Sequence, residues 1–215
     1  LGHNVLMFGR EEQRRSPHVR GEQLTTVRYH GKTVAETFVP EIGGAWKMDL
    51  TPVYEGVVSV SRTVIHMYPG YVAVLDEAEL ENDRDISLRW HTADRAEADG
   101  DGHFTVLTDN AQLSGVIINL SEGGLHLARH EHQYPEGTTD AVGNAVEARH
   151  ESYIDATLHG DRCRLLTLFC VKPAGAADVE WAQNEQGWSL DDVQVSVTDS
   201  GVELSSSSGS RQITL

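Results

Sequence analysis

The sequence lacks paired cysteines and long apolar runs. Cys163 and Cys170 are the only cysteines among 215 residues. They lie an odd number of positions apart in one predicted strand, where side chains alternate between faces, so they point to opposite sides and cannot form a bond. No apolar stretch is long enough to span a bilayer. We therefore expect two buried thiols, no disulfide framework and no membrane-spanning segment.

Positive charge is also scarce. Lys and Arg number 17 against 33 Asp and Glu, which gives a formal net charge of -16. Such a surface repels phosphate backbones and anionic membranes, so neither nucleic acid nor a membrane is an expected partner. The negative electrostatic potential of this surface also disfavours the binding of anionic polysaccharides. An exception is the region near the basic residues of a predicted long loop, Arg10, Arg14, Arg15 and Arg20.

Several catalytic motifs are absent. The chain contains no GxSxG nucleophile elbow, no GxGxxG dinucleotide fingerprint and no GxxxxGK phosphate loop. Carboxylate pairs such as Asp191 and Asp192 are common in so acidic a chain and are typical of a solvated surface. The residues on their own predict no catalytic group in this chain.

Helical periodicity is missing, and alternation of period two takes its place. The segment from Val57 to Met67 alternates strictly, Pro69 and Gly70 predict a turn, and Asn82 and Asp83 predict the next reversal. Evenly spaced short strands predict an all-β fold, a large antiparallel β-sandwich of two sheets forming a single domain over residues 1–215. The further strands expected are 71–76, 86–92, 104–107, 113–120, 125–130, 153–158, 164–172, 178–183, 193–198, 202–205 and 212–215.

Histidines are the first candidates for chemistry. His126, His130 and His132 share parity, so on one strand they project from one face, where His130 and His132 could chelate a divalent metal. This alternative corresponds to a metal-dependent β-barrel enzyme. Histidines on a solvated sheet face more often have no role, and that interpretation is preferred here.

Tryptophan offers a second alternative. Trp46, Trp90, Trp181 and Trp188 could stack on sugar rings, which would make the chain a carbohydrate-binding or interaction module without catalysis. Tryptophan in a sandwich more commonly fills the core. The sequence alone leaves this alternative open.

Three stretches resemble the heparinase II/III-like polysaccharide lyases. Leu1 to Leu6, followed by Gly9 and Gln13, is similar to the family's HNT-type segment. The family has a characteristic order of segments, which resembles the order here of Arg62-Thr63-Val64, the strand 71–76 and Leu88 to Thr92. Residues 167–173 resemble a strand of the family that ends in proline.

The resemblance implies an α-helical toroid followed by a C-terminal β-sandwich, and β-elimination on uronic-acid-containing polysaccharide. It implies that this chain is a fragment whose toroid and catalytic Tyr and His lie upstream, so that an upstream α-helical domain and an acidic polysaccharide are its partners. His3 matches a zinc ligand that acts with an upstream His and Asp. Zinc is thus expected in the longer parent protein, and no cofactor is expected in this chain. The implied parent is secreted or periplasmic.

Overall fold

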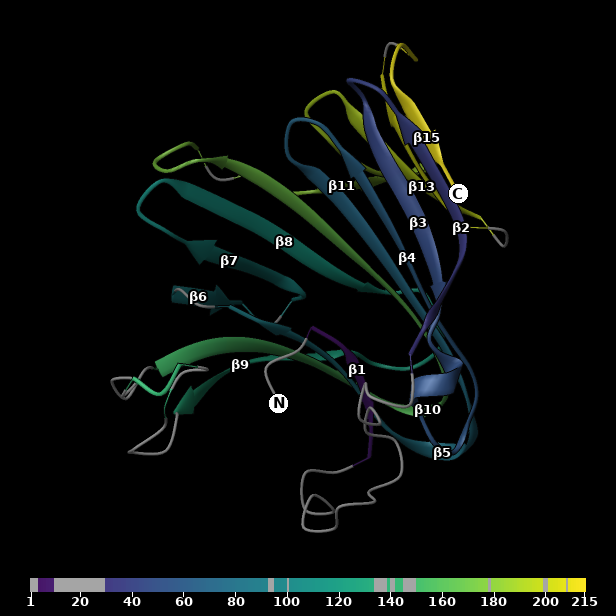
Figure 1. Cartoon of the computed structure of the whole chain (residues 1–215). Helices are drawn as coiled ribbons and strands as arrows, with labels where there is room; N and C mark the ends of the chain where they lie inside the picture. The colour runs from purple at the N-terminus through teal and green to yellow at the C-terminus, as the bar shows by residue number, and fades with distance from the viewer. Residues whose placement is uncertain are drawn as a thin grey trace.

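The computed structural model is all-β, an antiparallel sandwich of a ten-stranded and a five-stranded sheet (Figure 1). It describes residues 4–9, 30–92, 95–99, 101–133, 139, 142–144, 150–177, 179–198, 201–207 and 209–215. The predicted loop at 10–21 and most of that at 134–149 lie outside these residues. The predicted fold class is confirmed. Within the described residues, no helix is both long and apolar enough to cross a lipid bilayer.

The large sheet has the order β2-β3-β4-β5-β10-β8-β7-β6, with β1 on β5 and β9 on β10. Its strands are β1 (Leu6–Phe8), β2 (Lys32–Val39), β3 (Gly43–Asp49), β4 (Val57–Met67), β5 (Tyr71–His91), β6 (Arg95–Ala98), β7 (His103–Leu107), β8 (Ala111–Asn119), β9 (His126–Gln133) and β10 (His150–Pro173). The small sheet runs β11 (Ala182–Asn184), β12 (Gly187–Leu190), β13 (Val193–Thr198), β14 (Gly201–Ser206) and β15 (Gln212–Thr214). A single 3-10 turn, Thr51–Val53, is the described helical element.

The expected turn at Asn82 and Asp83 is wrong, because β5 continues through it as one strand. Gly160 of β10 pairs with Arg84, while Arg162 pairs with Glu79, so pairing resumes on the far side of a bulge. The polar residues therefore occupy the outside of a bend rather than a reversal. Strands expected separately at 153–158 and 164–172 are likewise parts of β10.

The bend divides the large sheet into two arms. In Figure 1, β1 and β9 lie in the lower arm, and β3, β4 and β8 lie in the upper arm. One core packs between the arms and includes Leu88 of β5, Ile154 of β10 and Phe104 of β7. A second core packs between the upper arm and the small sheet and includes Leu166 of β10 and Val195 of β13. Neighbouring residues of β10 such as Leu165 and Leu166 belong to different cores, so this central part of the upper arm is buried on both faces.

The two cysteines illustrate this double burial. Cys163 belongs to the core between the arms, and Cys170 belongs to the core beneath the small sheet. Both are free and buried, as predicted. Burial raises the pKa of Cys163 to about 12 and also raises that of Cys170. Neither thiol is poised for nucleophilic chemistry, which needs the thiolate.

Polar contacts join the small sheet to the large one. The Tyr71 hydroxyl donates to Asp191 Oδ2 at 3.0 Å, and Lys172 Nζ lies 3.1 Å from the same atom. Hydrogen bonds from Lys172 and Tyr71 lower the pKa of Asp191. Burial, with the nearby Asp191, raises the pKa of Tyr71 to about 12, so its hydroxyl stays protonated and donates. These contacts fix the β12–β13 turn against the start of β5.

Candidate functional site

The lower arm carries polar side chains on its face away from the core. On β5, Asp85, Ser87, Arg89 and His91 alternate with residues that face the core, and on β10 the same holds for Tyr153, Asp155, Thr157 and His159. Antiparallel pairing sets His91 opposite Tyr153, Arg89 opposite Asp155 and Asp85 opposite His159. Residues far apart in sequence are thereby brought to one face.

These side chains line a groove of about 640 Å³, here called the Tyr153 groove. Strands β1, β5, β9 and β10 all contribute to it. Its lining residues are Met7, Gly9, Asp85, Ser87, Arg89, His130, Tyr153, Asp155, Thr157, Leu158 and His159.

Tyr153 lies at the centre of a row of stacked rings. The centroid of its ring is 5.0 Å from that of His91 and 5.1 Å from that of His130, each at an interplanar angle of 26°. The Arg89 guanidinium carbon lies 4.3 Å from the centroid of the same ring. Because neighbouring strands hold all four residues, the phenol has a fixed position between two imidazoles and against a guanidinium.

The carboxylates of the groove are paired with basic side chains. Arg89 Nη2 donates to Asp155 Oδ2 at 2.8 Å, and both residues are buried. His159 Nδ1 lies 2.9 Å from Asp85 Oδ1 on the exposed side. In a chain of net charge -16 this pairing makes the groove less repulsive to an anionic ligand than the surrounding surface.

Asn4 is held at the end of this face by two strands. Arg62 Nη1 donates to its carbonyl at 2.5 Å, and the backbone N–H of His91 donates to its Oδ1 at 2.6 Å. Val5 continues the attachment by accepting from the N–H of Arg89. The residue before Asn4, the predicted zinc ligand His3, lies outside the described residues.

A buried ion pair supports this attachment from the core side. Arg62 Nε and Nη2 donate to the two carboxylate oxygens of Asp76 at 2.6 and 3.0 Å, and the guanidinium carbon lies 5.1 Å from the Trp90 ring centroid. Burial raises the pKa of Asp76, against the effect of Arg62. Burial alone would lower the pKa of Arg62, but the charge and hydrogen bonds of Asp76 outweigh it and raise that pKa.

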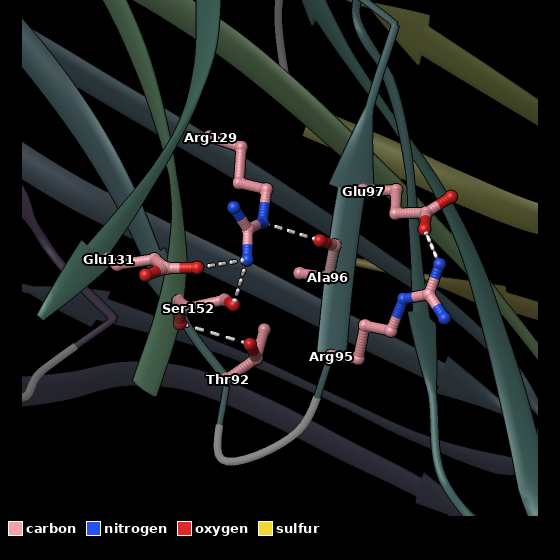
Figure 2. Close-up of polar contacts among 7 residues, drawn as sticks. All are labelled: Thr92, Arg95, Ala96, Glu97, Arg129, Glu131 and Ser152. Atoms are coloured by element: carbon pink, nitrogen blue, oxygen red, sulfur yellow. Dashed lines mark hydrogen bonds and ion pairs between the residues drawn. The ribbon is translucent and has the colours of Figure 1, made fainter. Parts of the chain in front are cut away.

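On the side of β9 opposite the Tyr153 groove, Arg129 joins the sheet edge to its neighbours (Figure 2). Its Nε donates to the carbonyl of Ala96 in β6 at 2.7 Å, and its Nη2 donates to Glu131 Oε1 at 2.8 Å and Ser152 Oγ at 3.1 Å. Thr92 Oγ1 donates to the Ser152 carbonyl at 3.0 Å. These contacts brace the part of β10 that carries Tyr153.

The histidines considered as a metal site are only partly assembled. His126, His130 and His132 lie on β9 opposite Thr157, Tyr153 and Glu151, as the shared parity requires. The imidazole of His130 stacks on Tyr153, whereas the side chain of His132 is not among those that the structure describes. Among the described residues, no group of three His, Cys, Asp or Glu side chains is placed to hold a metal. Those residues therefore contain no complete zinc site.

The sequence interpretation missed most of the groove. Tyr153, Asp155 and His159 were not singled out, although their alternation with Ile154, Ala156 and Leu158 was visible as a strand with one polar face. The missing information was the partner strand, because Arg89 and Asp155 meet only through a pairing between distant segments.

Comparisons with known proteins show which solved structures this fold is similar to. No protein-family model and no curated protein matches the sequence. A heparinase III with methylated lysines (TM-score 0.57, 11% identity), the heparan sulfate lyase HepC from Pedobacter heparinus (0.58, 11%) and a further heparinase III (0.54, 16%) each match over 86% of this chain. The chain spans less than a third of their length, at 27–28%. The resemblance drawn from the sequence is confirmed at the level of the fold: this chain is folded like a β-structured portion of heparinase III.

Proposed function

We propose that the chain is the C-terminal β-sandwich region of a heparinase II/III-like polysaccharide lyase and forms one wall of the cleft that binds acidic polysaccharide. The fold likeness over 86% of the chain to heparinase III and a heparan sulfate lyase carries this proposal. The Tyr153 groove supports it, because its carboxylates are paired with Arg89 and His159 and it offers imidazoles and a phenol to an anionic sugar.

In this proposal the eliminative chemistry belongs to the longer parent. Removal of the proton next to a uronate carboxylate needs a positioned base and a partner that stabilises the resulting charge. An α-helical domain upstream supplies the catalytic residues and packs against this sandwich. His3 supplies one ligand to zinc, and an upstream His and Asp supply the others, so the chain by itself retains no zinc.

The purified chain is expected to show no eliminative cleavage of heparan sulfate or alginate. The reason is that the base and charge-stabilising partner are contributed by the parent. Ultraviolet absorbance of the unsaturated uronate product measures the reaction. Turnover by the purified chain that disappears in His130→Ala or Tyr153→Phe would place the catalytic residues in this chain and contradict the proposal.

The chain is nevertheless expected to bind acidic hexasaccharides through the Tyr153 groove. His130→Ala should weaken binding about 3- to 10-fold, since one hydrogen bond or charge contact contributes about 1 kcal/mol. Calorimetric titration with hexasaccharides from heparan sulfate and alginate measures the affinity.

His126→Ala is the matched control, because His126 is exposed on the same strand but does not line the groove. Equal weakening by both substitutions would indicate a diffuse charge effect and would reject the groove as the contact site.

A further inference from the structure

Two aromatic side chains are exposed at the other end of the large sheet. Phe38 on β2 is 68% exposed and Trp46 on β3 is 39% exposed. Phe38 pairs with Gly44, and Glu36 pairs with Trp46, so all these residues share one sheet face. Trp46 is thus a diagonal neighbour of Phe38, a spacing at which aromatic side chains remain within reach of a common ligand. Of the four tryptophans, Trp46 departs from the expected core role.

A groove of about 510 Å³ lies at these rings, here called the Trp46 groove. Its other lining residues are Thr33, Glu36, Thr37, Gly44 and Ala45. A Cβ on Gly44 would lie 3.4 Å from Cδ2 of Phe38, which shows that the phenyl ring rests on the glycine. The ring is therefore supported from below while most of its surface faces solvent.

We propose that the Trp46 groove is a second saccharide-binding site and takes an uncharged sugar. The apolar C–H face of a sugar ring can pack on the indole and phenyl rings, which present large surfaces of low conformational entropy. The Glu36 carboxylate accepts hydrogen bonds from sugar hydroxyls, and hydrogen bonds to a charged acceptor are the stronger class. Thr33, which pairs with Met48 on the same face, adds a hydroxyl group at the rim.

Charge decides between sugar classes. Glu36 is the single charged residue among those lining the groove, and the chain as a whole carries a net charge of -16. A uronate or sulfate bound on the two rings would be repelled by this carboxylate, because no cation is among the lining residues. A neutral hexose or an N-acetylhexosamine would not be repelled. The Trp46 and Tyr153 grooves share no lining residue, so they differ in both place and preference.

The test is calorimetric titration of the chain with cellohexaose, chitohexaose and maltohexaose, compared with an oligoguluronate hexamer. At least one neutral hexasaccharide should bind and should quench tryptophan fluorescence, and the uronate should not compete for that site. Trp46→Ala should weaken this binding at least about 10-fold through loss of the stacking surface. Glu36→Gln should weaken it about 10-fold through loss of the charged acceptor.

Tyr68→Ala is the matched control, because Tyr68 is 40% exposed but does not line the groove. It should leave the affinity unchanged, and circular dichroism should show that all variants are folded. Absence of binding by every neutral probe, or binding that Trp46→Ala leaves intact, would overturn the proposal. Self-association in sedimentation that Trp46→Ala abolishes, without sugar binding, would also overturn it and assign the face to a second copy of the chain.

Discussion

Replacing Asp76 with alanine should lower the free energy of unfolding by about 3–5 kcal/mol, because it leaves the Arg62 guanidinium buried without its counter-charge. The side chain of Asp76 is 1% exposed and that of Arg62 is 11% exposed. Urea unfolding followed by circular dichroism measures the change. Arg62 also holds the carbonyl of Asn4, so the attachment of β1 should loosen as well.

Two controls separate burial from charge. Glu79→Ala removes the partner of Arg162 in an exposed ion pair between β5 and β10, and should cost less than about 1 kcal/mol. The double change Arg62→Met with Asp76→Leu removes both buried charges and should recover most of the loss. If Asp76→Ala and Glu79→Ala had equal effects, the ion pair would not be the buried anchor described here.

Gly43→Ala should lower the free energy of unfolding by about 3 kcal/mol or more, the largest effect expected of a small substitution. Gly43 has a φ of +150°, and an added Cβ would lie 1.9 Å from the carbonyl oxygen of His66 on β4. Either β3 separates from β4 or the backbone takes up strain, and both carry a cost. The melting temperature should fall by roughly 6–12 °C for a chain of this size.

Gly124→Ala provides the comparison for that change. No heavy atom lies within 4 Å of a Cβ placed at Gly124, and the expected effect is within about 0.5 kcal/mol. A Gly43→Ala variant as stable as Gly124→Ala would show that β3 and β4 do not approach as closely as the structure indicates.

The fold class could be predicted because alternation is a local signal. Val57 to Met67 and Val193 to Thr198 match β4 and β13 at both ends. Strand β2 was missed, since it is an edge strand with nearly all residues exposed and carries a weak apolar pattern. The mistaken turn at Asn82 arose because a polar pair on a bend has the same composition as a reversal.

The site was harder to predict than the fold. Arg89 and His91 were noticed within a motif, but their chemistry depends on Tyr153 and Asp155 of a strand far along the chain. Cross-strand register cannot be read from either segment separately. The exposure of Trp46 also depends on its place in the fold, because the same residue type is buried in the core at Trp181, just before β11.

The pairing of β5 with β10 has a consequence for biosynthesis. Strand β5 ends at His91, whereas its longest partner begins only at His150. While the ribosome makes the intervening residues, one edge of β5 has no partner, and Ala73 and Leu88, which belong to different cores, have yet to be covered. Such nascent chains expose apolar surface and unpaired backbone groups together, a combination that favours misassociation. The interval before β10 emerges is therefore the period in which this polypeptide leaves most of one edge of β5 unpaired and open to misassociation.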